Sequence, residues 1–70
     1  MKEELLKEIK ILRKAVEMEN ELVNIYLSQN DYEVGYPKMI MCYERINEYV
    51  KMIGDNRVKL LKLGLKKYNI

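Results

Sequence analysis

The sequence predicts an all-α protein: a long N-terminal helix and an antiparallel second helix forming a helical hairpin, plus a shorter C-terminal helix, assembling as a helical-bundle homo-oligomer. Three observations support this prediction. Residues 2–29 contain neither Gly nor Pro, apolar residues recur at the three- and four-residue spacing of a helix, and the 70-residue chain has one cysteine and no histidine. A chain this short has a small core, and without a disulfide or a zinc site a partner subunit is the remaining way to enlarge it.

The first predicted helix covers residues 2–29 and has a wide apolar face. Its apolar positions cover about 200° of the helix surface, whereas a surface helix needs about 100° to face a single core. We therefore expect this helix to pack on two sides. One apolar stripe consists of Leu5, Ile9, Leu12, Val16, Val23 and Tyr26, and the other of Ile11, Ala15, Met18, Leu22 and Ile25. The predicted oligomer interface consists of Leu5, Ile11, Met18, Leu22 and Ile25.

A loop is predicted at residues 30–36 and a second helix at residues 37–53. The loop is rich in side chains that compete for backbone hydrogen bonds and contains Gly35, while Pro37 suits a first helical position. Gly54 is well placed to end the second helix. The apolar stripe of this helix consists of Met39, Cys42, Tyr43, Ile46, Tyr49, Val50 and Ile53.

A basic third element is predicted at residues 56–69, with Asp55 or Asn56 as its N-cap. As a helix it presents apolar residues on one side, although Gly64 costs about 1 kcal/mol relative to Ala. As a strand it alternates leucine with lysine or glycine. We favour the helix, because a lone strand would have no partner strand in this chain. Residues 1–70 are expected to form a single helical domain.

Helix lengths give a second reason to expect association. At about 1.5 Å per residue, the first helix spans about 42 Å and the second about 25 Å. A second helix of that length would cover Val16 to Tyr26. It would leave Leu5, Ile9 and Leu12 for the third element or for another subunit.

The sequence has no recognisable set of catalytic residues. Cys42 has no histidine to act as its base, and its place in an apolar stripe indicates a buried structural cysteine. There is no glycine-rich phosphate-binding loop and no acidic cluster spaced like a calcium site. We therefore predict a protein that is not an enzyme and uses no cofactor or metal. The alternative is an active site shared between subunits, in which Glu19 or Cys42 is essential.

Two glutamates interrupt the apolar face of the first helix. Glu19 lies at the centre of that face and Glu8 lies near its axis. A buried, unpaired carboxylate is costly, so each must reach water or have a partner. The expected partners are Arg45, a tyrosine hydroxyl such as that of Tyr43 or Tyr49, or a lysine. A paired carboxylate could fix the register of a bundle or contact a ligand.

Tyrosine is the only aromatic residue in the chain, with six copies. Tyr32 and Tyr36 lie in the predicted loop, which has no periodicity that would bury them. Tyrosine is enriched at interfaces because it gives a large contact area at a small entropic cost. Met41, Arg45 and Met52 lie off the main stripe of the second helix, and methionine suits adaptable contacts. These five residues form the predicted partner-binding surface.

Charge is segregated along the chain. Residues 1–34 have five Lys/Arg against eight Asp/Glu, residues 35–54 have three against two, and residues 55–70 have five against one. The basic C-terminal segment could bind nucleic-acid phosphates without base specificity, or it could complement the acidic first helix. The nucleic-acid contacts would be Arg57, Lys59, Lys62, Lys66 and Lys67.

The sequence therefore predicts a small interaction protein that binds a protein partner to regulate or inhibit it. Its composition would suit a phage or mobile-element accessory protein. The alternative is a nucleic-acid or nucleotide-binding module that uses the basic segment and the tyrosines. No apolar run approaches the ~20 residues of a membrane span and no signal-peptide pattern follows Met1. We expect a cytoplasmic protein, in the host cell cytoplasm if it is viral.

Overall fold

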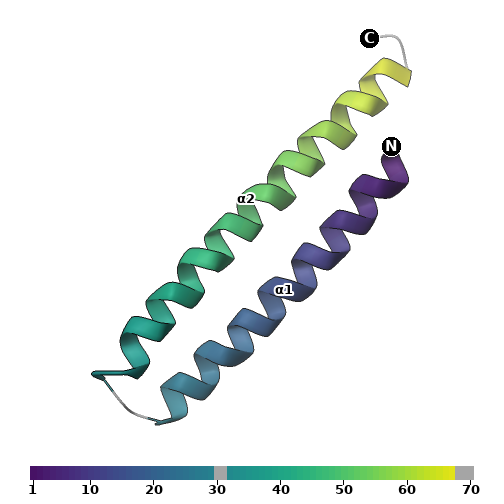
Figure 1. Ribbon diagram of the computed structural model, residues 1–70. Helices are drawn as coiled ribbons and strands as arrows, with labels where there is room; N and C mark the ends of the chain where they lie inside the picture. The colour runs from purple at the N-terminus through teal and green to yellow at the C-terminus, as the bar shows by residue number, and fades with distance from the viewer. Residues whose placement is uncertain (30–31, 68–70) are drawn as a thin grey trace.

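The chain forms two long antiparallel helices joined by a short turn (Figure 1). The computed structural model describes residues 1–29 and 32–67, with side chains up to residue 64. Helix α1 comprises Lys2–Gln29, helix α2 comprises Gly35–Lys67, and residues 32–34 form a turn between them. The molecule is a rod of 55 × 16 × 12 Å. The start of α1 and the last part of α2 lie together at what we call the open end. The all-α prediction is confirmed for the described residues.

Helix α1 has the bounds that the sequence predicts. Glu3 and Glu4 lie in its first turn, where a negative charge interacts favourably with the helix dipole. In its last turn the Ser28 hydroxyl donates a 2.7 Å hydrogen bond to the Ile25 carbonyl. Both features stabilise helix ends, which lack part of the backbone hydrogen bonding of the interior.

Helix α2 differs from the prediction, because it is one continuous helix of 33 residues. The predicted end at Gly54 and the separate C-terminal helix are wrong, and so is the strand alternative for residues 57–67. Residues 68 and 69 of that element lie outside the described residues. The helix also begins at Gly35, two residues before Pro37. Proline is tolerated there because the first-turn N–H groups have no partner within the helix.

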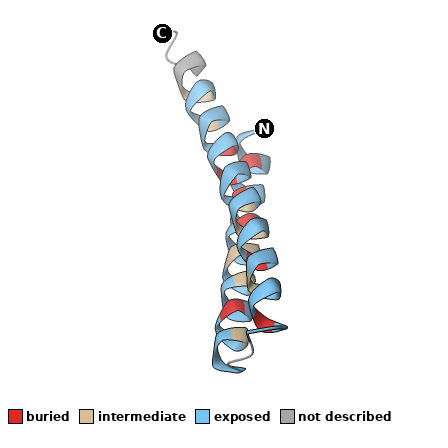
Figure 2. Cartoon of the chain, turned by 90° about the vertical axis from the view of Figure 1, so that its left-hand side faces the viewer, coloured by how far each residue is buried: buried red, intermediate tan, exposed pale blue. Residues whose placement is uncertain are grey.

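The helix continues through Gly54 because the apolar repeat does so. In both helices the residues that face the other helix alternate three- and four-residue steps, which is the 3.5-residue repeat of a coiled coil. We call this contact the seam, and burial follows it along the rod (Figure 2). Keeping the repeat in register outweighs the cost of about 1 kcal/mol for an interior glycine. The seam residues are Leu5, Ile9, Leu12, Val16, Glu19, Val23 and Tyr26 of α1, and Met39, Cys42, Ile46, Tyr49, Ile53, Asn56, Leu60 and Leu63 of α2.

The core lies toward the open end, in the part of α1 that was expected to remain uncovered. Ile9, Leu12 and Ile53 form its buried cluster, with Tyr49 and Leu60 packed against them. At about 1.5 Å per residue, α2 spans about 50 Å against about 42 Å for α1. The expected overhang of α1 is therefore wrong.

One predicted interface residue changes its role with this correction. Leu5, which we assigned to the oligomer interface, is only 9% exposed and belongs to the seam. The helix lengths consequently give no support to association. The expectation of association now depends on the exposed apolar surface described below.

Replacing Gly54 with alanine tests the continuity of α2. We expect the free energy of unfolding to rise by about 0.5–1 kcal/mol, because alanine favours a helix interior over glycine. The added Cβ would have no neighbouring atom within 4 Å. Urea unfolding followed by circular dichroism measures the change. A loss of stability would instead indicate a helix end at Gly54 with a left-handed backbone.

Candidate interaction surfaces

A bidentate ion pair joins the two helices. Arg45 Nε lies 2.8 Å from Glu19 Oε1, and Arg45 Nη2 lies 3.1 Å from Glu19 Oε2. Arg45 Nη2 also donates a hydrogen bond to Cys42 Sγ at 3.5 Å. The Glu19 side chain is only 14% exposed, whereas that of Arg45 is 40% exposed. Of the partners expected for Glu19, the structure shows Arg45. The Arg45 guanidinium forms its hydrogen bonds to Glu19 and Cys42 of the same chain.

The ion pair changes the protonation equilibria of its members. The hydrogen bond from Arg45 lowers the pKa of Glu19, against an opposing effect of desolvation. Burial, together with the nearby Glu19 carboxylate, raises the pKa of Cys42. The Cys42 thiol is 1% exposed and stays protonated at neutral pH. It therefore lacks the thiolate character of a reactive cysteine.

The variant Glu19→Gln tests the contribution of the ion pair. Because the pKa of Glu19 is lower in the folded chain, this contribution is fully present above the ordinary glutamate pKa of about 4.3. It is lost as the pH falls through the lowered value. We expect the variant to be less stable at neutral pH and to lose less stability on acidification to about pH 3.

Urea midpoints over this pH range measure the effect. Glu17→Gln, an exposed glutamate of the same helix, is the matched control and should behave like the parent. A Glu19→Gln variant with the parent's pH dependence would contradict the expectation.

Two contacts define the register of the hairpin. Glu19 pairs with Arg45, and Lys38 Nζ lies 5.6 Å from the centre of the Tyr26 ring. In both contacts the residue numbers add up to 64, so residue n of α1 lies beside residue 64 − n of α2. Because Glu19 and Arg45 bond to each other, the flank of α1 nearer Glu19 and the flank of α2 nearer Arg45 form the same side of the rod.

An exposed apolar surface lies on that side. Successive side chains of a helix are about 100° apart. On this basis four apolar residues of α1 lie on the Glu19 flank, outside the seam, and two apolar residues of α2 lie on the Arg45 flank. They are between 37% and 65% exposed. We call this surface the methionine face, and it joins residues that we predicted to serve two different interfaces. It consists of Ile11, Met18, Leu22 and Ile25 of α1, and Met41 and Met52 of α2.

Two tyrosines contact each other where the chain enters α2, Tyr32 in the turn and Tyr36 in the first turn of the helix. The rings of Tyr32 and Tyr36 lie 4.8 Å apart at an interplanar angle of 73°, an edge-to-face arrangement. This is a preferred geometry for aromatic pairs. Both residues remain exposed, Tyr32 by 62% and Tyr36 by 44%. We call this pair the tyrosine turn. The predicted partner-binding set is thus divided among the tyrosine turn, the methionine face and the ion pair.

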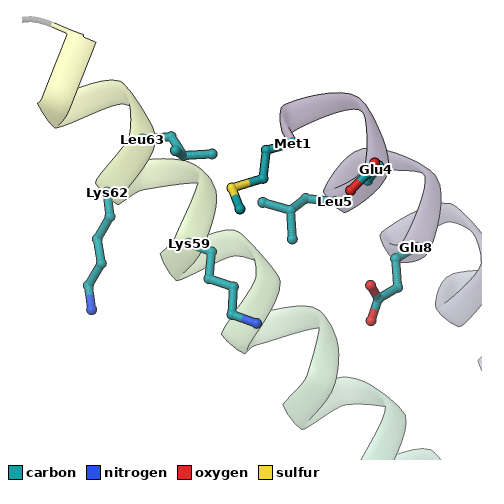
Figure 3. Close-up of a pocket in the computed structure, with 7 residues that line it drawn as sticks. All are labelled: Met1, Glu4, Leu5, Glu8, Lys59, Lys62 and Leu63. Carbon is teal, nitrogen blue, oxygen red and sulfur yellow. The ribbon is translucent and has the colours of Figure 1, made fainter.

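A cleft of about 490 Å³ lies at the open end of the hairpin. Met1 and Leu5 of the first turns point toward Leu63 of α2 (Figure 3). Charged side chains of both helices surround this apolar centre. Glu8 is exposed, so of the two expectations for it, contact with water holds. The charged residues of the cleft are Glu4, Glu8, Lys59 and Lys62.

The basic residues predicted to contact nucleic acid do not share one surface. Lys59 and Lys62 line the cleft, whereas Arg57 lines a separate shallow depression with Lys10 and Arg13 of α1. The side chains of Lys66 and Lys67 lie outside the described residues. The described part of α2 therefore has no continuous basic stripe, and Arg57 instead joins cations of α1.

Asn56 is a seam residue whose position we did not predict. It was expected to cap a helix, but it is 4% exposed and its Nδ2 has no hydrogen-bond partner among the described residues. A buried donor without an acceptor costs about 1–3 kcal/mol. The repeat Ile53, Asn56, Leu60 already pointed to the seam, but the apparent helix end at Gly54 concealed it.

The remaining observations concern metals, membranes and relatives. The described residues contain no group of three or more His, Cys, Asp or Glu side chains that could hold a metal ion. Within the same residues, neither helix combines the length and the apolarity needed to cross a membrane. Comparisons with protein-family models, curated proteins and solved structures gave no match to the chain. Its function must therefore be inferred from the surfaces described above.

Proposed function

We propose that the chain is a small, non-enzymatic interaction protein that binds a protein partner to regulate or inhibit it. The observation that carries this proposal is the distribution of apolar side chains. Among the described residues, seventeen large apolar side chains are exposed and six apolar side chains are buried. Extensive exposed apolar surface is typical of proteins that associate with other macromolecules. We place this function in the cytoplasm, that of the host if the chain belongs to a phage or mobile element.

The tyrosine turn is the surface that we assign to the protein partner. Tyrosine provides a large apolar contact and a hydroxyl that can form hydrogen bonds at the edge of an interface. The edge-to-face contact between Tyr32 and Tyr36 reduces the side-chain freedom that binding would remove. The turn lies at the end of the rod opposite the open end (Figure 1).

The double variant Tyr32→Ala/Tyr36→Ala tests this assignment. The full-length parent and the variant are used to capture proteins from an extract of the source cells, and captured proteins are quantified by mass spectrometry. We expect the variant to capture the specific partner at least about tenfold less, as for loss of aromatic residues that dominate an interface.

Tyr43→Ala is the matched control, because Tyr43 is 48% exposed but lies on α2 outside the turn. It should capture the partner as the parent does. Undiminished capture by the double variant would reject the tyrosine turn as the partner site.

Nucleic-acid binding is a second candidate function, which one observation favours. Lys10 and Arg13 of α1 and Arg57 of α2 surround the same shallow depression. Three cations brought together from two helices could contact a phosphate backbone. This site differs from the predicted basic segment, of which it includes only Arg57.

Salt titration tests this second candidate. Binding of the full chain to single- and double-stranded oligonucleotides is followed by fluorescence anisotropy from low to high salt. If phosphate contacts form, a plot of log affinity against log salt concentration should fall with a slope of about 0.7–0.9 per contact. Arg13→Ala/Arg57→Ala should reduce this slope, and Lys51→Ala, an exposed residue away from the depression, should not. Absence of binding at low salt would exclude the candidate.

A further inference from the structure

We propose that the shallow depression surrounded by Lys10, Arg13 and Arg57 binds a phosphate monoester, that is, a terminal phosphate group on a ligand or a side chain. The depression has a volume of about 280 Å³ and is lined by residues of both helices. This inference goes beyond the proposed protein partner, which we assign to the tyrosine turn. For the site of the second candidate function it names a different ligand, and the experiments below separate the two ligands.

The charges that flank the seam are complementary on one side of the rod but not on the other. Flanking residues of a coiled coil usually have opposite signs on the two helices, because such pairs stabilise it. On the side of the methionine face, Glu19 bonds to Arg45. The flanking positions of the opposite side hold Arg13 on α1 and Arg57 on α2, which line the same depression. The other described residues at these positions are uncharged, namely Leu6, Asn20 and Leu27 of α1 and Tyr36, Tyr43, Val50 and Gly64 of α2.

The three cations of the depression form no ion pair with a described residue. The acids of α1 on this side are Glu3, about two turns before Lys10, and Glu17, about one turn after Arg13. Both are exposed, and Glu3 lines a neighbouring depression with Lys10. Like charges brought together from two helices repel each other and destabilise the hairpin. A local arrangement that lowers stability is typical of a functional site, and an anion bound among the cations would remove the repulsion.

The compact arrangement of the cations favours a phosphate monoester over a nucleic-acid backbone. A monoester has about 1.5 to 2 negative charges at neutral pH and three strong acceptor oxygens on one phosphorus atom. A phosphodiester has a single charge, so a nucleic acid is best contacted by cations spread along its length. The described part of α2 has no such stripe. The planar guanidinium groups of Arg13 and Arg57 suit paired hydrogen bonds to the oxygens of one phosphate.

The floor of the depression is apolar. Leu6, Ile9 and Leu60 line it together with the three cations. Apolar atoms exclude water from one side of the site, which strengthens the attraction between the cations and a bound anion. Leu6 is 48% exposed and offers a contact for the carbon group that carries the phosphate. The site therefore suits a phosphate on an aliphatic or aromatic group.

Titration with phenyl phosphate, a monoester with an aromatic group, tests the inference. Binding to the full chain is followed at low salt by the NMR chemical shifts of the backbone amides. We expect saturable binding, with the largest shifts at residues that line the depression. Methyl phenyl phosphate, the matched diester, should bind about tenfold more weakly, because it has a lower charge and fewer free oxygens.

Variants of Arg57 test the position of the site. Arg57→Gln should weaken the binding of phenyl phosphate about tenfold, as for the loss of a charge-assisted hydrogen bond. Arg57→Lys should recover part of this loss, because it restores the charge without the planar fork. Lys51→Gln is the matched control, an exposed residue of α2 away from the depression, and should bind as the parent does. Urea unfolding without phosphate should show that Arg57→Gln is no less stable than the parent, because the substitution relieves repulsion.

Three results would each overturn the inference. The first is the absence of saturable binding of phenyl phosphate at low salt. The second is binding of methyl phenyl phosphate as tight as that of phenyl phosphate. The third is an equal effect of Arg57→Gln and Lys51→Gln, which would indicate attraction by the overall charge of the chain and not by this site.

Two further probes identify the source of the phosphate. One is a short peptide with a single phosphoserine, and the other is a nucleoside monophosphate. Each is compared with its dephosphorylated form, which should bind about tenfold more weakly. Tighter binding of the peptide would assign the site to a modified protein, and tighter binding of the nucleotide would assign it to a small molecule. Equal binding of the phosphorylated and dephosphorylated forms of both probes would contradict the inference.

The same measurements distinguish this inference from the proposed functions. Tyr32→Ala/Tyr36→Ala should bind phenyl phosphate as the parent does, because the tyrosine turn is separate from the depression. Partner capture by a parent that does not bind phenyl phosphate would overturn the phosphate site alone. An oligonucleotide without terminal phosphates that binds with the expected salt slope, while phenyl phosphate does not bind, would overturn the inference and support the second candidate function.

Discussion

The ion pair between Glu19 and Arg45 determines how the two helices lie against each other. An apolar seam with a seven-residue repeat can in principle slip by one repeat, because leucine, isoleucine and valine replace one another at low cost. A slip would leave the nearly buried Glu19 carboxylate without its guanidinium, which is far more costly than a change of apolar neighbours. The bidentate geometry accepts a single register. The positions of the methionine face, the cleft and the tyrosine turn all follow from it.

A hairpin of two helices can bury only one stripe of each helix, and this limit explains the surface of the molecule. Helix α1 has a second apolar stripe that α2 cannot reach, since a helix in contact with one neighbour covers about 100° of its surface. The same limit leaves Asn56 at the edge of a narrow core, buried but without a hydrogen-bond partner among the described residues. The exposed apolar side chains and the unsatisfied amide thus have a common origin in the small number of packed layers.

The helical fold could be predicted from the sequence because the repeat of α1 is uninterrupted by Gly or Pro. The continuity of α2 was missed because Gly54 and Asn56 resemble a helix end followed by a cap. That local signal has an energy of only about 1 kcal/mol, and contacts such as those of Ile53 and Leu60 with α1 outweigh it. For the interaction surfaces, the residue types were recognisable, but their grouping was not. Met41 and Met52 join the exposed stripe of α1 only once the register is known.

The antiparallel topology orders the contacts by their distance from the turn. Tyr26 and Lys38 are twelve positions apart and Glu19 and Arg45 are twenty-six apart, while the contact of the first turn with Leu63 closes almost the whole chain. Each doubling of loop length adds about 0.6 kcal/mol of closure entropy, so a folding chain gains the contacts near the turn at the lowest entropic cost. By this term the open end costs the most entropy to close. The buried cluster of Ile9, Leu12 and Ile53 lies in that half of the rod, so the largest apolar contacts stand where the entropic cost is greatest.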